Sequence, residues 1–169
     1  MTGDRSSEFV RERVAALGLE PHPEGGFYRE IYRSAATLPL PRGTRNLMTV
    51  IHFVLPPGAV SAWHLVRADE AWCHLAGDPL ELHRVNDAGS HDVVHLGAGP
   101  GGASAAAVVP AGVWQAAKCA GAVGSHVVCT VAPGFDFRDF AMADADALSA
   151  RFPALAGVLR QFASRPATS

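Results

Sequence analysis

The chain has 169 residues, of which 49% are hydrophobic and 18% are charged, a composition typical of a globular protein rather than a disordered one. Its formal net charge of −2 gives no electrostatic basis for nucleic-acid binding, and no apolar run approaches the ~20 residues that span a bilayer. Because the charged N-terminus also lacks the apolar stretch of a signal peptide, we expect a cytoplasmic protein with neither a nucleic-acid nor a membrane partner.

The first elements are a helix, a loop and two strands. A helix is predicted over residues 6–18, because Phe9, Val10 and Val14 recur on one stripe at helical spacing. The segment HPEGG, residues 22–26, predicts a loop, and a strand with alternating faces is expected from 27 to 34. The β-branched run LMTVIHFVL predicts a buried strand before the turn Pro56-Pro57-Gly58.

The middle of the chain contains many short apolar runs separated by turn residues. Strands are expected near residues 59–66, 70–76, 79–85, 91–96, 105–109, 113–118 and 124–132. Strands of this length and spacing indicate a sandwich or a barrel. The last part of the chain, about 143–163, is predicted to be helical with a break at Pro153. We therefore expect one all-β domain over residues 1–169, with the barrel at about 22–140.

The most informative pattern is GAVSAWHLVRADEAWCHLAG, in which Gly58, His64, Glu70 and Gly77 follow one another at intervals of six, six and seven residues. A strand, a polar turn and a second strand would bring the imidazole and the carboxylate to one inward wall. The later stretch PAGVWQ, residues 110–115, has the character of another strand start that carries a polar side chain. Together these stretches predict a polar group of side chains at the mouth of a barrel, a common place for small-molecule sites.

His64, Glu70 and His74 could act together if their strands face the same cavity. Two imidazoles and a carboxylate can ligate a divalent transition metal, and an imidazole can act as a base that a carboxylate orients. The alternative is structural: His74 packs among aromatic residues, and Glu70 pairs with Arg67 at the turn. The spacing alone leaves both interpretations open.

Several motifs resemble a known family. GAVSAWHLVRADEAWCHLAG resembles the first cupin motif, and PAGVWQ resembles the start of the second, Pro-x-Gly-x-x-His. PHPEGGFYREIYRS, ADEAW, GDPLELH, VPAGVWQAA and TVAPGFDFRDF together resemble the cupin_5 (DUF985) family over roughly residues 17–153. The resemblance implies a double-stranded β-helix, the cupin jelly-roll barrel, and a homodimer.

The resemblance also bears on metal binding. Cupins often hold a metal through two His and a Glu of the first motif and a His of the second, and the matching positions here are His64, Val66, Glu70 and Gln115. Val66 cannot ligate, and Gln115 offers only a neutral carbonyl oxygen. What remains is an incomplete set for Fe, Ni, Mn or Zn, with His74 as a substitute ligand.

This chain departs from its relatives beside the first motif. Members usually read Trp-His-Phe-Tyr where this chain has Trp72-Cys73-His74-Leu75. In a strand, a displacement by one residue moves a side chain to the opposite face, so His74 is expected to point the way the family's aromatic residue does. The displaced histidine is either sequence drift on a permissive wall or the basis of chemistry that the relatives lack.

Substrate-binding side chains are expected on the HPEGG loop, on the strand after it and on the barrel wall. The candidates are Glu24, Arg33, Phe53, Ser61, Trp72, Trp114, Gln115 and Phe135. Arg33 would suit an anionic substrate and would equally suit a solvated edge. Asp136 could orient a histidine or could satisfy the backbone amides of a turn.

Three classes of function compete. The favoured class is a metal-independent isomerase or epimerase, in which His64 removes a proton α to a carbonyl, Glu70 or Asp136 orients His64, and Tyr28 is the acid. Such an enzyme would suit a tailoring step in a biosynthetic pathway. The second class is a metal-dependent lyase, decarboxylase or oxygenase that uses His64, Glu70, Gln115 and His74. The third is a non-catalytic protein that binds a sugar-like or nucleotide-like small molecule.

Overall fold

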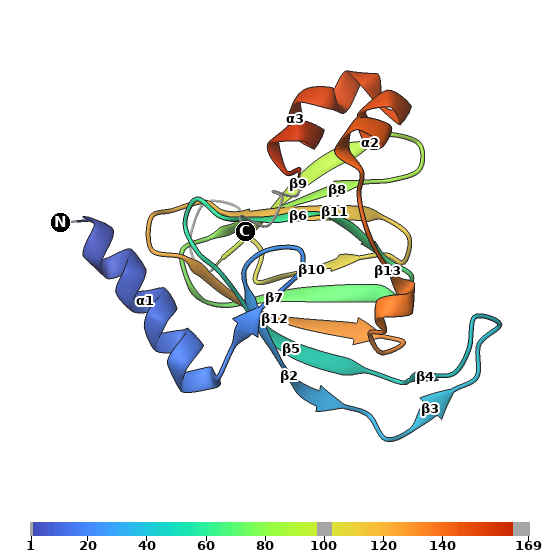
Figure 1. Cartoon of the computed structure of the whole chain (residues 1–169), viewed down its shortest axis with the longest axis horizontal. Coiled ribbons are helices and arrows are strands. Elements are labelled where there is room, and N and C mark those ends of the chain that lie inside the picture. The colour runs from blue at the N-terminus through green and yellow to red at the C-terminus, as the bar shows by residue number, and fades with distance from the viewer. Residues whose placement is uncertain (1, 98–102, 164–169) are drawn as a thin grey trace, which may run out of the picture.

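The computed structural model describes residues 2–97 and 103–163 and consists of two packed β-sheets with helices at both ends of the chain (Figure 1). The helix α1, Thr2–Leu17, begins earlier than the predicted residue 6. It ends before Gly18, whose positive φ of 60° suits the end of a helix. No helix in the described parts of the chain is long and apolar enough to cross a membrane.

The first sheet is antiparallel throughout, in the spatial order β1-β2-β5-β12-β7-β10. In that order its strands are β1 (Glu20–Pro21), β2 (Phe27–Arg33), β5 (Thr49–Leu55), β12 (Ser125–Ala132), β7 (Asp69–Gly77) and β10 (Ala106–Val109). Neighbouring strands come from distant parts of the chain, so the fold is closed by long-range pairing.

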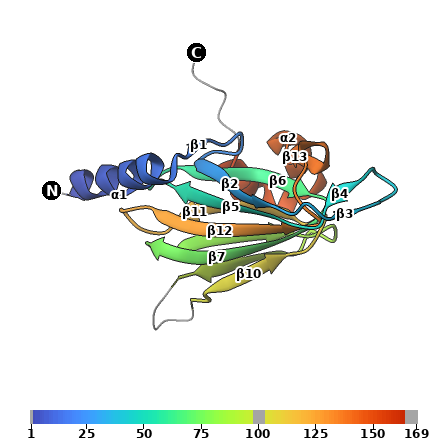
Figure 2. The same ribbon diagram turned by 90° about the horizontal axis from the view of Figure 1, so that it is seen from below.

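The second sheet has the order β13-β6-β11-β8-β9, and a separate short hairpin joins β3 to β4. The sheet strands are β13 (Phe140–Met142), β6 (Val60–Val66), β11 (Trp114–Cys119), β8 (Leu80–Val85) and β9 (His91–Leu96). The hairpin strands are β3 (Thr37–Leu38) and β4 (Arg45–Asn46), and Figures 1 and 2 show them projecting beyond the sheets.

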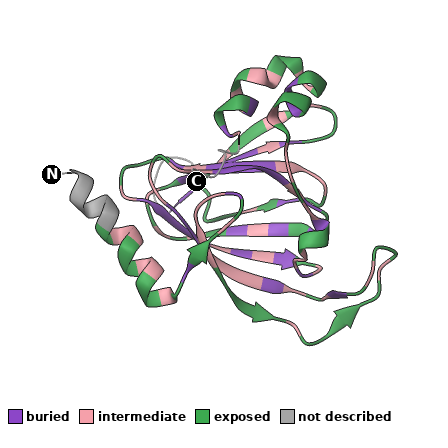
Figure 3. Cartoon of the chain, viewed as in Figure 1, coloured by how far each residue is buried: buried purple, intermediate pink, exposed green. Residues whose placement is uncertain are grey.

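The main core lies where the inner faces of the two sheets meet. Phe53, Trp72 and Val127 of the first sheet pack with Leu82 and Ala117 of the second. Side chains of alternating parity along each strand supply this layer, because successive residues of a strand point to opposite faces. Figure 3 shows the resulting mixture of buried and partly exposed positions along the central strands, whereas β2 and the β3–β4 hairpin are largely exposed.

The strands predicted from the sequence are all present, and the all-β class is confirmed. The sequence missed the shortest strands, β1, β3, β4 and β13, which carry too few residues for alternation to show. The C-terminal part forms α2 (Ala145–Arg151), the 3₁₀ turn η2 (Pro153–Leu155) and α3 (Ala156–Gln161). The break therefore falls at Pro153, as predicted.

Candidate functional site

A cavity of about 460 Å³ opens beside the core. The strands β2, β5, β7 and β12 of the first sheet form one wall, and β6 of the second sheet contributes His64 and Val66. The segment from Phe135 to Phe140, which includes the 3₁₀ turn η1 (Phe137–Asp139), forms another side. A concave site of this size suits a small molecule.

Aromatic rings form much of the cavity wall. They belong to Tyr28, Phe53, Trp72, Phe135, Phe137 and Phe140. The rings of Phe53 and Trp72 meet edge to face at 5.7 Å, and those of Phe135 and Phe137 do so at 5.0 Å. These geometries fix the ring orientations, so the cavity has a shaped apolar lining.

An imidazole and a carboxyl group meet inside the cavity. His64 Nε2 lies 3.2 Å from Glu24 Oε2, and both side chains are almost fully buried. His64 Nδ1 lies 2.8 Å from the carbonyl oxygen of Ala62, which can only accept, so this nitrogen carries a proton. Ser61 Oγ donates to Glu24 Oε1 at 2.8 Å. The second proton of the pair is therefore shared between His64 Nε2 and Glu24 Oε2.

Two consecutive glycines place Glu24 against His64. Gly25 and Gly26 have positive φ values of 109° and 73°, which L side chains rarely adopt. A Cβ on Gly25 would lie 2.1 Å from the carbonyl oxygen of Val60, so the turn lies directly against β6. The amide of Ala62 donates to the carbonyl oxygen of Glu24 at 2.8 Å and fixes the loop to the same strand. The HPEGG segment therefore delivers a carboxyl group to the strand that carries His64.

A second carboxyl group, that of Glu70, enters the cavity from β7. Gln115 Nε2 donates to Glu70 Oε2 at 2.6 Å, and Trp72 Nε1 donates to Gln115 Oε1 at 3.0 Å. The indole thereby fixes which end of the amide faces Glu70. Glu70, Trp72 and Gln115 are all buried, so this chain of hydrogen bonds is shielded from solvent.

Burial changes the protonation of these groups. Burial, only partly offset by the Ser61 hydrogen bond, raises the pKa of Glu24 to about 8. Burial also raises the pKa of Glu70 to about 7, with His64 opposing the shift and Glu24 reinforcing it. The pKa of His64 is lowered by burial, which outweighs the attraction of Glu70. Near neutral pH, Glu24 is therefore protonated while Glu70 is partly ionised.

Two further polar residues face the cavity beside Glu24. Burial, followed by the proximity of His64, lowers the pKa of His22 to about 4, so His22 is neutral. Its Nδ1 accepts from the Glu24 amide at 3.3 Å, and its ring meets that of Tyr28 edge to face at 4.5 Å. Burial and the nearby carboxylates of Glu20 and Glu30 raise the pKa of Tyr28, so its phenol remains a donor.

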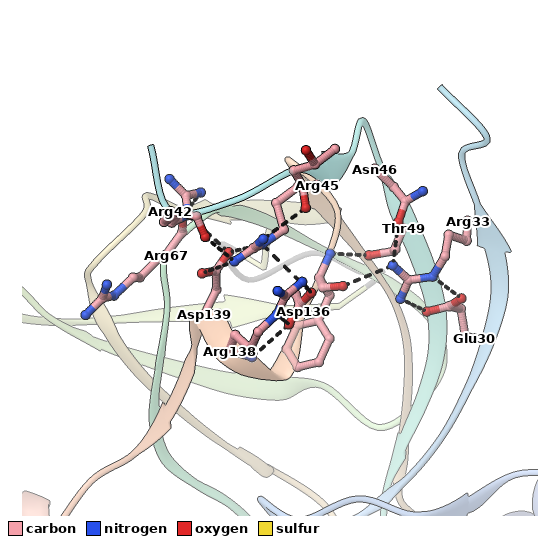
Figure 4. A network of polar contacts seen from close by, with 12 residues as sticks. Glu30, Arg33, Arg42, Arg45, Asn46, Thr49, Arg67, Asp136, Arg138 and Asp139 are labelled. Atoms are coloured by element: carbon pink, nitrogen blue, oxygen red, sulfur yellow. Dashed lines mark hydrogen bonds and ion pairs between the residues drawn. The ribbon is translucent and has the colours of Figure 1, made fainter. Parts of the chain in front are cut away.

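The rim of the cavity carries paired charges (Figure 4). Arg33 makes two hydrogen bonds to Glu30, at 2.9 and 2.7 Å, and its Nη1 also reaches Asn46 Oδ1 and the carbonyl oxygen of Phe135. Asp136 accepts from the backbone amide and the side chain of Arg138. Asp136 thus caps the turn η1 and does not contact His64, which agrees with the turn alternative.

The structure brings most of the sequence-predicted site residues together. Glu24, Tyr28, Arg33, Phe53, His64, Glu70, Trp72 and Phe135 line the cavity. Ser61 and Gln115 do not line the cavity themselves. Ser61 is hydrogen-bonded to Glu24, and Gln115 is hydrogen-bonded to Glu70.

His74 and Trp114 differ from the prediction, because neither lines the cavity. His74 lies about 13 Å along β7 from Glu70, and its Nε2 donates to the carbonyl oxygen of Asp78 at 3.0 Å. Pairing between β7 and β12 also shifts register beside His74. Trp114 has the opposite parity to Gln115 on β11, so its ring packs with the cluster under the C-terminal helices.

The carboxyl partner of His64 also differs from the prediction, which named Glu70 or Asp136. Glu24 makes the direct contact, from a loop that is far from β6 in the sequence. Wall residues that the sequence analysis did not select include Glu20, Glu30, Thr49, Ile51, Cys129, Val131 and Phe140. Strand parity with Tyr28 could have identified Glu30, since the two residues are separated by one position on β2.

The donor groups do not fit a metal centre. No group of three His, Cys, Asp or Glu side chains in the described ranges is arranged to hold a metal ion. Val66 and Gln115 occupy two of the four cupin ligand positions, and the Gln115 carbonyl oxygen already accepts from Trp72. His64 directs its only unprotonated nitrogen at Glu24. We therefore derive no chemistry through a metal.

Comparison with known proteins identifies related sequences. The family model described as "Cupin superfamily (DUF985)" matches residues 11–143. A hypothetical protein from Leishmania major is 32% identical with a TM-score of 0.85, and the match covers 92% of this chain and 98% of that chain. A protein from Shewanella oneidensis is 33% identical with a TM-score of 0.85, covering 95% and 98%. No curated protein matches the chain.

More distant structures identify the fold. An uncharacterized conserved protein with a double-stranded β-helix domain from Klebsiella pneumoniae is 21% identical, with a TM-score of 0.53 and coverage of 80% and 94%. An oxalate decarboxylase variant from Bacillus subtilis is 16% identical, with a TM-score of 0.55 and coverage of 87% and 38%. At these identities the likeness concerns the fold alone, and it confirms the predicted double-stranded β-helix.

Proposed function

The chain belongs to the Cupin_5 (DUF985) family of the cupin superfamily, and on that basis we propose that it is a small-molecule isomerase or epimerase that works by proton transfer. The observation that carries the proposal is the pair of buried carboxyl groups, Glu24 and Glu70, beside His64 in one cavity. Two titratable groups whose environments give them different protonation states are the usual requirement of acid–base catalysis.

In the proposed step, one carboxyl group acts as the base and the other as the acid. The ionised Glu70 takes a proton from a carbon next to a substrate carbonyl, and the C–H electron pair forms an enolate. Protonated Glu24 donates to the carbonyl oxygen, which stabilises the developing negative charge. Return of a proton to either the same or the neighbouring carbon gives the epimer or the isomer, with no net oxidation.

The remaining polar residues position these two groups. His64 Nε2 shares the proton of Glu24 while the Ala62 carbonyl oxygen holds Nδ1, so His64 orients that proton. The enol oxygen returns the proton to Glu24 when the substrate carbonyl re-forms. Gln115 and Trp72 hold the Glu70 carboxylate in place. Tyr28, whose ring contacts that of His22, is a second donor toward the substrate oxygen. These assignments differ from the initial hypothesis, in which His64 itself was the base.

Hydrogen exchange with solvent tests the proposal without knowledge of the substrate. The protein is incubated in D₂O with dihydroxyacetone, aminoacetone and glucosamine, and NMR follows the loss of the C–H signals next to the carbonyl. We expect exchange by the wild type on at least one probe and a loss of about 100-fold or more in Glu70→Gln. An exchange rate that is equal in the wild type and Glu70→Gln for every probe would contradict the proposal.

The pH dependence of this exchange provides an internal check. The rate should rise as Glu70 ionises, with a pKa of about 7, and fall as Glu24 loses its proton, with a pKa of about 8. A profile that is flat from pH 6 to 9 would exclude this pair of groups as acid and base. Binding of the probes without any exchange would instead favour the alternative of a non-catalytic binding protein.

We also propose that the protein forms a homodimer. The edge strand β2 pairs with the two-residue β1 over only its first residues, and it leaves Ile31 and Tyr32 about half exposed. An unpaired strand edge with apolar side chains is a surface on which a strand of another chain can pair.

A further inference from the structure

The charged side chains around the cavity are mostly acidic. Arg33 is the only arginine or lysine lining it within the described residues, whereas five carboxyl groups do so. They are Glu20, Glu24, Glu30, Glu70 and Asp136. His22 and His64 add no positive charge, because burial lowers the pKa of each.

Four of the five N–H groups of Arg33 are already bound within the protein. Its Nε and Nη2 bind the two carboxylate oxygens of Glu30, and its Nη1 binds Asn46 Oδ1 and the carbonyl oxygen of Phe135. Arg138 pairs with Asp136 and lies outside the lining. A bidentate contact of Arg33 with an anionic substrate would therefore require breaking at least one of these hydrogen bonds.

The other three carboxyl groups have no arginine or lysine partner among the described residues. Arg and Lys side chains form no ion pair with Glu20, Glu24 or Glu70 there, and only His22 and His64 approach Glu24. Burial of two carboxyl groups without a cation is unfavourable for their ionised forms, and this is the physical reason that Glu24 is protonated and Glu70 only partly ionised near neutral pH. A positive charge placed in the cavity would remove that penalty.

Aromatic faces complete the environment for a positive charge. Tyr28, Phe53 and Trp72 approach the cavity from the first sheet, and Phe135, Phe137 and Phe140 approach from the side of η1. Phe137 is 55% exposed at the rim although it is a large apolar side chain. Rings that surround a site together with carboxylates are the usual means of recognising ammonium groups.

We propose that the cavity recognises a small organic cation, an amine or a quaternary ammonium group carried by the substrate. This assignment rests on the proposed function, because it names the substrate class of the same site. The carboxyls of Glu20 and Glu70 supply the opposite charge, and the rings of Phe135, Phe137 and Phe140 supply the cation–π surface.

Proton release is a direct consequence of this recognition. A bound cation stabilises the ionised form of Glu70, which supplies part of the opposite charge, so the pKa of Glu70 falls when the ligand binds. Protons then leave the protein for the buffer. The number released is obtained by calorimetry of the same titration in buffers of different ionisation enthalpy.

Choline and its uncharged analogue 3,3-dimethyl-1-butanol provide a matched pair of probes, because they share a shape and differ in charge. Each is titrated into the full-length protein at constant ionic strength, with NMR and calorimetry as the readouts. We expect choline to bind at least about tenfold more tightly, the factor that ~1.4 kcal/mol of cation–π and charge attraction provides. We also expect choline binding to release protons.

Variants identify the surface that provides this preference. Phe137→Leu keeps an apolar side chain and removes the ring, so it should weaken choline binding about threefold to tenfold and leave the neutral analogue unchanged. Glu20→Gln should also weaken choline binding and leave binding of the neutral analogue unchanged. Phe152→Leu, in the C-terminal segment, and Glu12→Gln, on α1, are matched controls and should bind choline as the wild type does.

Two results would overturn the proposal. One is equal affinity for choline and 3,3-dimethyl-1-butanol, and the other is tighter binding of the anionic analogue 3,3-dimethylbutanoate. Neither result depends on catalysis, so a failure of the cation-site proposal can be distinguished from a failure of the proposed isomerase activity. Hydrogen exchange without choline preference refutes the cation site alone, and choline preference without hydrogen exchange refutes the proposed isomerase alone.

Discussion

At the scale of single residues, burial and hydrogen bonding determine where the protons of the cavity reside. Glu24 and Glu70 are each about 7% exposed, and neither faces a lysine or an arginine in the described parts of the chain. Burial keeps the Glu24 carboxyl group protonated near neutral pH, so it can donate a hydrogen bond, which an ionised carboxylate cannot. An ordinary glutamate thereby becomes an acid that works near neutral pH.

Glu24→Gln should reduce the pH dependence of stability above pH 6.5 and leave the smaller contribution of Glu70, whose pKa is about 7. The pKa of Glu24 in the folded protein, about 8, lies above the ordinary 4.5, so folding retains a proton that the unfolded chain has lost. The free energy of unfolding therefore falls as the pH rises through about 8. We expect this contribution to shrink by about 1 to 2 kcal/mol between pH 6.5 and 8, as measured by urea unfolding, and to be absent in Glu24→Gln.

The pH window of this test is chosen to exclude the histidines. Burial lowers the pKa of His22 and His126 to about 4, so both change stability in the opposite direction, and only below their ordinary value of 6.5. Glu12→Gln, an exposed substitution on α1, should keep the wild-type slope. Identical slopes in the wild type and Glu24→Gln would show that Glu24 is ionised in the folded protein.

At the scale of elements, the HPEGG turn is the connection that assembles the site. It joins β1 to β2 and lies against β6, so one loop contacts both sheets. Gly26 has a positive φ, and a Cβ there would lie 2.9 Å from the ring of Phe53. The conformation that brings Glu24 to His64 therefore requires glycine at both positions of the turn.

Gly25→Ala should destabilise the protein strongly, because the new Cβ would lie 2.1 Å from the Val60 carbonyl oxygen and φ is +109°. Gly58→Ala is the matched control, since φ is +75° and no atom lies within 4 Å of its Cβ. We expect a loss of about 1–2 kcal/mol for Gly58→Ala, from backbone strain alone, and at least about 3 kcal/mol for Gly25→Ala. Equal losses in urea unfolding would show that the turn can move away from β6.

The sequence predicts elements better than it predicts contacts between them. Strand parity placed Glu70 and Trp72 on the cavity wall, and the HPEGG motif indicated a loop beside the barrel. Parity could not give the contact between Glu24 and His64, because that contact depends on how a glycine turn packs against a distant strand. It also failed at His74, where the β7–β12 pairing shifts register and the ring binds a backbone carbonyl group.

At the scale of the whole molecule, the two sheets provide a scaffold whose open edge holds the site. A buried ion pair fastens this edge: Arg45 Nε and Nη2 donate to the two oxygens of Asp139, at 2.8 and 3.0 Å (Figure 4). Arg42 adds a contact to the same carboxylate at 3.1 Å. The end of the β3–β4 hairpin is thus tied to the turn η1, which carries Phe137 at the rim.

The overall architecture was predictable, because short alternating strands and the cupin-like motifs both indicate a double-stranded β-helix. The rim was not, since β3, β4 and β13 are two or three residues long and their placement depends on ion pairs between distant segments. Arg45 and Asp139 are almost a hundred positions apart, and nothing in their local sequence relates them. The acidic, aromatic character of the cavity likewise emerges only when the strands are assembled.

The central claim is that burial raises the pKa values of Glu24 and Glu70 to near neutral pH, and a carboxyl titration tests it most directly. The side-chain carboxyl ¹³C signals of labelled glutamate are followed by NMR from pH 4 to 9 and assigned with Glu24→Gln and Glu70→Gln. We predict a pKa of about 7 for Glu70 and of about 8 for Glu24. Titration of both groups near the ordinary glutamate value of 4.5 would contradict the account.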